Sequence, residues 1–309
     1  MHDSSESAWM VRVMPAAFVA LWSTGFIVAR YGMPHAPPFS FLEMRYALSA
    51  ACLLLWALAA RAVWPQARTQ WGHLAITGVL MQACYLGGVW AAVKHGMGAG
   101  LSALVVGLQP VLTGLWLSAL GGHVTRRQWI GLALGLCGLV LVVWHKLELG
   151  EVNALNLSFA ALALAGITAG TLYQKRFVQP CDVRVAGLVQ MVAAFVVTMP
   201  LAMLETEAPR WLTPAGGLNV ELVGALAWSV LGLTLVASSL LYLMIQRGAA
   251  TRVASLMYLV PPVTALLAWQ LFGEPITALT VAGVVLTAVG VSVVVRSPAP
   301  PVPPARHPS

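Results

Sequence analysis

The chain has 309 residues, of which 59% are hydrophobic and only 9% are charged. A soluble domain carries roughly 25% charged residues, so most side chains here must face lipid rather than water. The formal net charge of +7 would suit nucleic acid, but Lys and Arg stand singly or in pairs between apolar runs, as they do at membrane flanks, and we expect no nucleic-acid partner.

Ten apolar runs follow one another along the chain. A spanning helix needs about 20 mostly apolar residues, and the gaps between these runs carry the Pro, Gly and charge signals of turns. The predicted spans cover residues 11–31, 39–60, 70–92, 98–119, 127–145, 154–174, 184–204, 222–244, 251–271 and 276–296. The Pro-rich tail, 297–309, cannot build a core and is expected to be disordered. The expected fold is therefore all-α and integral to the lipid bilayer.

The second half of the chain repeats the first at an offset of 152 residues. This offset carries Pro110 onto Pro262 and Gly131 onto Gly283, within a longer series of matched residues. A repeat of this kind indicates two halves of one ancestor, here 11–145 and 154–296. Because five spans per half is an odd number, the halves must be inverted in the membrane, as is typical of secondary transporters.

The distribution of basic residues predicts the orientation. With the N-terminus in the cytoplasm, twelve Lys and Arg fall on the cytoplasmic side and four on the other, with Arg45 inside a span. Cytoplasmic loops carry the excess of basic residues in membrane proteins. We therefore expect a multi-pass protein of the cell (inner) membrane with both termini in the cytoplasm.

Several short motifs resemble those of a known family. Residues 21–26 (LWSTGF) resemble its "W-s-x-f" opening, and residues 41–46 (FLEMRY) resemble its "a-x-R-f/y" signature. The stretch from Pro262 through 271–274 (LFGE) to Gly290 resembles its ending. The chain is thus similar to the EamA-type branch of the drug/metabolite transporter superfamily. The resemblance implies ten spans in two inverted repeats and transport of amino acids, sugars, nucleotides or other metabolites.

Two positions depart from the family pattern. The first half has Gly121–Gly122 where the family often has Gly-Glu, so that acid is kept only as Glu274. The position in the seventh span that corresponds to Arg45 is Gln190, at an offset of 145.

Polar and aromatic side chains repeat at i, i+4, i+8 in the third and eighth spans, which places each set on one helix face. The first set is Gln82, Leu86 and Trp90, with Tyr85 on the same side; the second is Thr234, Ser238 and Tyr242. We expect them to line a central cavity in which aromatics stack against a solute and polar groups orient it, with Trp22 serving the cavity or a gate. The alternatives are hydrogen bonds between helices or interfacial aromatic belts.

Prolines interrupt the fourth and ninth spans. Pro110 and the pair Pro261–Pro262 each remove a backbone hydrogen bond and free the carbonyl four residues earlier. We expect hinges that expose polar backbone to the path, with Gln109 and Tyr258 beside them. A static packing kink is the alternative.

Glu43 and Arg45 are the charges well inside an apolar run. Two residues apart on a helix, they cannot pair with each other. Glu43 is a candidate proton carrier, and Arg45 a candidate gate or carboxylate contact. Alternatively, Arg45 snorkels to the interface or bonds a structural partner such as a helix-end carbonyl.

Three observations bear on cofactors and assembly. The His and Cys residues show no metal-binding spacing, so we expect no metal and no cofactor. Small residues recur on the fifth span at Gly131, Gly135 and Gly138, and on the tenth at Gly283 and Gly290, which predicts close helix packing. Alternatively, such a stripe could form the contact surface of a homodimer.

A secondary transporter working by alternating access is the function these features favour. The aromatic cavity without a cluster of charge favours amino acids or their analogues, and we expect export. An integral-membrane enzyme would show acidic clusters, an HExxH helix or an embedded Ser/His pair, so we expect no enzyme activity. A channel would show a filter-like loop. A membrane scaffold without a transport cycle is the remaining alternative.

Overall fold

The computed structural model describes residues 3–119, 125–238, 240 and 257–296. Within these ranges the regular elements are helices, and the only strand-like pairing is an isolated bridge between Leu212 and Leu218. The first half contains α1 (Asp3–Gly32), α2 (Pro38–Ala59), α3 (Arg68–Gly78), η1 (Val79–Cys84), α4 (Tyr85–Lys94), α5 (Ala99–Val106), α6 (Gln109–Ala119) and α7 (Arg126–Glu148). The second contains α8 (Ala154–Phe177), α9 (Val183–Met203), α10 (Val220–Ala227), η2 (Trp228–Ala237), η3 (Met257–Leu259), α13 (Val260–Phe272) and α14 (Ala278–Arg296).

Seven segments of the described chain are long and apolar enough to cross a membrane. Three of them join several elements: α3, η1 and α4 form one run, α5 with α6 another, and α10 with η2 the third. Three further apolar helices, Ala16–Gly32, Val260–Phe272 and Ala278–Val293, are shorter. Every expected span overlaps one of these ten segments. The all-helical membrane fold is confirmed, whereas ten complete crossings stay a prediction.

The helices begin and end where local side chains satisfy free backbone groups. Thr125 and Gln128 form a reciprocal capping box at the start of α7, and Asn153 with Asn156 does the same for α8. At the end of α13, Gly273 adopts a left-handed conformation with φ 67°, which suits glycine and stops the helix. The sequence thus sets these boundaries locally.

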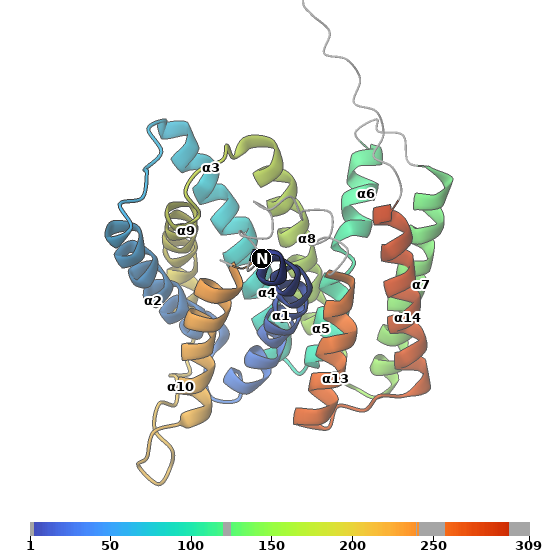
Figure 1. Ribbon diagram of the computed structural model, residues 1–309. Helices are drawn as coiled ribbons and strands as arrows, with labels where there is room; N and C mark the ends of the chain where they lie inside the picture. The colour runs from blue at the N-terminus through green and yellow to red at the C-terminus, as the bar shows by residue number, and fades with distance from the viewer. Residues whose placement is uncertain (1–2, 120–124, 239, 241–256, 297–309) are drawn as a thin grey trace, which may run out of the picture.

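Each long helix of one half packs chiefly against a helix of the other half. The principal pairs are α2 with α9, α4 with α8, α5 with α13, and α7 with α14, while α1 packs on α13, η2 and α10. Figure 1 shows α7 and α14 side by side at one edge and α2 near α9 at the other. The two halves therefore share one core instead of forming two separate bodies.

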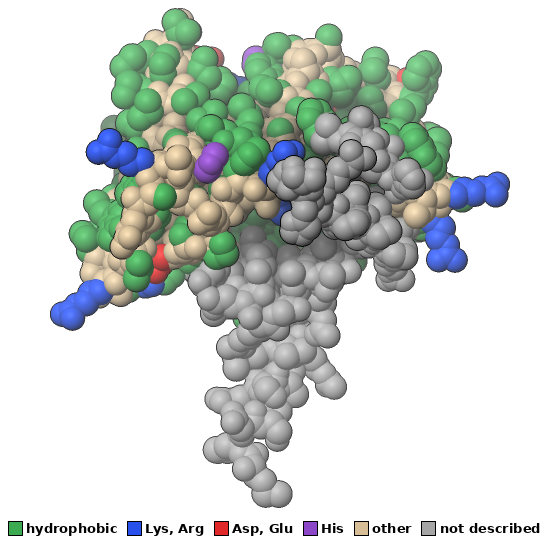
Figure 2. Space-filling view, turned by 90° about the horizontal axis from the view of Figure 1, so that it is seen from above, with side chains coloured by type: hydrophobic (Ala, Val, Ile, Leu, Met, Phe, Trp, Pro, Cys, Tyr) green, Lys and Arg blue, Asp and Glu red, His purple; other side chains and the backbone are tan. Residues whose placement is uncertain are grey.

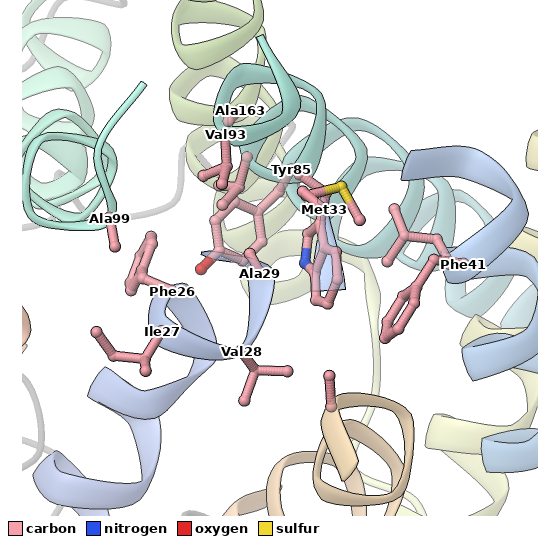
Figure 3. Packing of buried hydrophobic residues seen from close by; sticks show 14 of the residues in the cluster. Phe26, Ile27, Val28, Ala29, Met33, Phe41, Tyr85, Val93, Ala99 and Ala163 are labelled. Atoms are coloured by element: carbon pink, nitrogen blue, oxygen red, sulfur yellow. The ribbon is translucent and has the colours of Figure 1, made fainter. Parts of the chain in front are cut away.

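The shared core is visible around α1. Figure 3 shows Phe26 and Ala29 of α1 facing Tyr85 and Val93 of α4, with Phe41 of α2 beside them. These side chains are all buried and belong to one hydrophobic cluster. Large apolar residues on the outside, such as Trp144 and Leu55, are more than 60% exposed, as expected of side chains that contact lipid.

The glycine stripes pack against each other within the chain. A Cβ atom built on Gly138 would lie 2.5 Å from the carbonyl oxygen of Gly283, and one on Gly290 would lie 2.4 Å from the amide nitrogen of Gly135. The two backbones therefore approach closely, which confirms the packing interpretation. Because α14 covers this stripe, it is not free to join a second copy.

Gly138→Ala should destabilise the protein by about 1–3 kcal/mol, because the added methyl forces α7 and α14 apart. The measurement is the thermal unfolding midpoint of the purified protein in detergent. Gly72→Ala is the matched control: a Cβ there meets nothing within 4 Å. Its midpoint should stay or rise, since Ala favours a helix over Gly. Equal midpoints for both variants would contradict the close α7–α14 contact.

Candidate functional site

A cavity of about 110 Å³ lies between the two halves, beside η1, α4 and η2. Eight of the residues singled out in the sequence border it: Trp22, Arg45, Gln82, Tyr85, Leu86, Trp90, Thr234 and Ser238. Phe26, Val89, Met191 and Leu233 supply apolar wall between them. Both polar stripes thus meet at one space, as the repeated pattern predicts.

A second cavity, of about 630 Å³, adjoins the first. The two share Trp22, Phe26, Met81 and Ile167 in their walls. The larger one is also lined by the break between α5 and α6, by the start of α13 and by the α8–α9 connection, residues 178–182. Gln109, Pro110 and Pro261 border it, whereas Pro262 borders neither cavity.

The helix winding widens at both polar stripes. Val79–Cys84, which includes Gln82, and Trp228–Ala237, which includes Thr234, are π-helical. Inside α-helices such wide turns are frequent at functional sites. They leave backbone groups to be satisfied by other partners: the Tyr46 hydroxyl donates to the Gln82 carbonyl at 2.8 Å. The two wide turns occupy matching positions in the two halves, a feature that α-helical spacing could not reveal.

Pro110, in the fourth span, occupies a helix start and not a helix centre. α5 ends at Val106, Gly107 and Leu108 form a turn, and α6 begins at Gln109 with Pro110 in its first turn. There a proline is tolerated because its missing N–H has no intrahelical partner. The expected mid-helix kink at Pro110 is therefore wrong, and the span is broken into two helices.

In the second half α13 likewise begins beside its prolines: it starts at Val260, directly after η3, with Pro261 and Pro262 in its first turn. The break at Gly107 and the start of α13 lie close together: a Cβ on Gly107 would lie 2.8 Å from Cγ of Pro261. Glycine at 107 permits this approach. Broken helices are how membrane transporters expose backbone at a central site.

The aromatic residues differ in how much surface they offer. Trp22 is partly buried and borders both cavities. Trp90 is 1% exposed and stacks on Phe41 with ring centroids 4.4 Å apart. Trp90 thus forms wall more than a free stacking face. Tyr242 and the side chain of Tyr258 lie outside the described residues.

The polar residues of the stripes are partly engaged with neighbours. Thr234 donates to the Ser229 carbonyl at 3.0 Å and accepts from Ser49 at 3.3 Å, while Ser238 donates to the Leu233 carbonyl. Gln109 donates to the hydroxyl of Thr171 at 2.8 Å. The hydrogen bonds between helices expected as an alternative are therefore present, alongside the cavity.

The two intramembrane charges on α2 have different settings. Arg45 is 6% exposed and borders the smaller cavity, and its Nε has no hydrogen-bond partner. Glu43 is partly buried and borders neither cavity. The expected structural partner of Arg45, a helix-end carbonyl, is not found among the described residues.

At one end of the molecule, two carboxylates of the second half bind helix starts of the first half. Glu205, after α9, accepts from the amides of Phe39 and Ser40 at 2.8 Å each, and from the Ser40 hydroxyl at 2.7 Å. Glu274, after α13, accepts from the amide of Ala99 at 2.8 Å. Each acid of the second half thus caps a helix of the first half, α2 and α5 respectively, where the helix dipole favours negative charge. We call this end the capped face; it carries residues 33–38, 94–98, 204–219 and 273–277.

Further contacts reinforce the capped face. The Lys94 ammonium donates to the Met33 carbonyl at 3.2 Å and pairs with Glu207 at 3.0 Å. The hydrogen bond from Lys94 lowers the pKa of Glu207, which favours the charged form of that carboxylate. At the opposite end, the Arg184 guanidinium donates a hydrogen bond of 2.7 Å to the Asp182 carboxylate. This bond lowers the pKa of Asp182 and so favours its charged form.

Metal chemistry finds no support in the described part of the chain, where no group of three or more His, Cys, Asp or Glu residues is placed to hold an ion.

Comparison with known proteins places this chain in a family of transporters. The EamA-like transporter family matches residues 11–144 and again residues 155–296. The chain belongs to this family. It is thus a multi-pass membrane transporter of small molecules, and the resemblance noted in its motifs is confirmed.

Individual relatives agree. An uncharacterized inner membrane transporter of Escherichia coli K12, YedA, is 29% identical over 84% of this chain and 82% of its own length. A protein of Salmonella typhimurium LT2 named "Probable amino-acid metabolite efflux pump" is 29% identical over 88% of this chain and 90% of its own. A solved crystal structure covers 91% of this chain and 96% of its own, with TM-score 0.61 and 18% identity, which shows the fold alone.

Cysteines placed in the cavity of this transporter should be accessible to water. In a variant whose four natural cysteines are replaced, Leu86→Cys and Ser238→Cys should react with a charged thiol reagent, because both positions border the cavity. Leu48→Cys is the control: Leu48 is 47% exposed in the middle of α2, where the contact is lipid. If both cavity positions stay unreactive in every condition, the space is dry and is not a solute path.

Proposed function

We propose that this protein is a secondary transporter that exports small metabolites, with amino acids or their analogues first, by alternating access. The observation that carries the proposal is a pair of adjoining cavities between the halves, the smaller bordered by the two wide helix turns and the larger by the helix starts at Gln109 and Val260. Such a cavity is where inverted-repeat transporters bind their solute. The relative named as an amino-acid metabolite efflux pump supports the solute class and the direction.

The two halves are proposed to be inverted five-helix repeats, 11–145 and 154–296, that cross the membrane ten times. The pairing of α2 with α9, α5 with α13 and α7 with α14 supports this, because each pair joins matching spans of the two halves. Two matches to the family over nearly the same ranges support it too. A pseudo-two-fold axis in the membrane plane would relate the members of each pair.

The capped face is proposed to be the exterior and the opposite end the cytoplasm. Lys and Arg prevail on the opposite end: Figure 2, which looks down on it, shows basic side chains around the rim and few acidic ones. Both termini then lie in the cytoplasm. The larger cavity runs to the α8–α9 connection at this end. The structure would accordingly be an inward-facing state.

Outward opening then requires the caps on α2 and α5 to break. The first half has Ala60 and Gly122 at the positions that match Glu205 and Glu274, so no equivalent acid serves the cytoplasmic end. Hydrogen bonds to charged groups contribute about 1.5–3 kcal/mol each, so this asymmetry favours closure on the exterior. Solute binding would have to offset that bias to open the outer end.

The other functions find less support. An enzyme or a scaffold would not require a cavity lined by corresponding residues of the two repeats. Membership of a transporter family also favours transport. A channel would have to open at both ends, whereas the capped face is held by at least two caps and an ion pair. Neither a proton-carrying role for Glu43 nor a homodimer gains support from the placement of the residues concerned.

Replacing both caps should shift the transporter towards the exterior-open state. Glu205→Gln with Glu274→Gln removes the two negative charges with little change of shape, and should raise the rate at which Ser238→Cys is labelled from outside by about tenfold or more. Glu148→Gln is the control, because Glu148 accepts from Trp144 on its own helix. Unchanged outside labelling in the double variant would contradict the role of the caps.

Trp22→Ala should weaken the apparent affinity for solute. Aromatic stacking is worth about 0.5–1.5 kcal/mol beyond burial, or roughly three- to tenfold in the half-saturating concentration. Trp90→Ala should instead lower stability, by about 3–5 kcal/mol, because Trp90 is buried against Phe41. Uptake into inverted vesicles and the unfolding midpoint measure the two effects. Trp269, 55% exposed on α13, is the control, and a Trp22→Ala variant with parental affinity would remove this residue from the site.

A further inference from the structure

One cation borders the candidate cavity with no partner in the described part of the chain. Arg45 is 6% exposed, its Nε makes no hydrogen bond, and it lies in the wall with Gln82 and Tyr85. The nearby Tyr46 hydroxyl is already committed to the Gln82 carbonyl. A buried guanidinium without a partner is costly, because its hydration is lost and nothing replaces it. Such a group inside a membrane is a candidate for function.

Among the described side chains, no carboxylate borders the cavity beside Arg45. Of the ten Asp and Glu residues, those with described side chains border neither cavity. Seven of them have partners elsewhere: Glu148, Glu151, Asp182, Glu205, Glu207, Glu221 and Glu274. Glu43, two positions from Arg45 on α2, also borders neither cavity.

The remaining acids do not change this balance. Asp3 and Glu6, whose side chains are not described, stand near the start of α1, and Glu6 precedes Trp22 by roughly 24 Å of helix at 1.5 Å per residue. The segments 120–124, 241–256 and 297–309 contain no Asp or Glu in the sequence. The larger cavity adds a second cation, Lys175, at its far end. The solute path therefore offers positive charge without negative charge.

We infer that Arg45 binds the carboxylate of the solute, and that the solute class is a small organic monocarboxylate with an apolar body. This inference rests on the proposed transport function and assigns Arg45 to the binding site instead of a gate. The planar guanidinium suits a carboxylate because it can donate two parallel hydrogen bonds. Trp22 and Phe26 in the same wall receive the apolar body. A free amino group is tolerated but not required, since no acid faces it.

Three matched probes test the class on the full-length protein in detergent: phenylalanine, 3-phenylpropanoate and phenylalaninamide. A ligand that binds the folded state raises the unfolding midpoint. We expect phenylalanine and 3-phenylpropanoate to raise it at millimolar concentration, and phenylalaninamide, which lacks the carboxylate, to leave it unchanged. Two outcomes would overturn the inference: phenylalaninamide raises the midpoint as much as the two acids do, or neither acid raises it.

Arg45→Gln and Arg45→Lys test the residue. Arg45→Gln should weaken the affinity for 3-phenylpropanoate about tenfold or more, and Arg45→Lys should restore part of it by keeping the charge. The ligand-free midpoint of Arg45→Gln should be unchanged or higher, because no hydrogen bond is lost. A structural arginine would show the reverse, a lower midpoint with unchanged affinity. Arg30→Gln removes the same charge at a residue bordering neither cavity and should leave affinity unchanged.

Transport in proteoliposomes separates this inference from the function on which it rests. If the parent protein accumulates 3-phenylpropanoate and Arg45→Gln does so with the same half-saturating concentration, the carboxylate contact is wrong and the transporter stands. If the parent protein binds the acids in detergent but moves neither across the membrane in either orientation, alternating access is wrong while the binding site stands.

Discussion

Every backbone amide and carbonyl inside the bilayer must find a partner within the protein or in a water-filled cavity, and this constraint organises the molecule. Regular α-helix meets it along most of the chain. Among the described residues, departures occur at two pairs of matching places: the wide turns Val79–Cys84 and Trp228–Ala237, and the helix starts at Gln109 and Val260. All four border the two joined cavities. The irregular backbone thus marks the path, where its free groups find partners in side chains, such as the Tyr46 hydroxyl, or in the cavity.

The two ends of the molecule differ although the halves match. At the capped face, Glu205 and Glu274 each tie a helix of the first half to the second. The sequence offers Ala60 and Gly122 at the matching positions of the other end. Two similar repeats therefore form two ends of unequal stability. This suits the proposed exporter, because a resting state open to the cytoplasm exposes the binding site to the solute that is to be exported.

Much of the fold could be predicted from the sequence, because apolar runs, matched prolines and basic flanks report directly on lipid contact and repetition. The stripes around Gln82 and Thr234 were found because both halves repeat them. The wide helix turns could not be predicted, since i, i+4 spacing assumes α-helical winding. The kink expected at Pro110 was wrong because a residue without an N–H fits a kink within a helix and the start of a helix equally well. Glu205 was missed because a carboxylate that caps a helix of the other half carries no local pattern.

Sidedness of access to the cavity tests the central claim most directly. Ser238→Cys, in a chain without other cysteines, is labelled with a membrane-impermeant thiol reagent in sealed vesicles of both orientations. Without solute, labelling should occur from the cytoplasmic side and be slow from the exterior; saturating solute should raise the exterior rate. Equal, fast labelling from both sides at once would indicate an open channel and contradict alternating access.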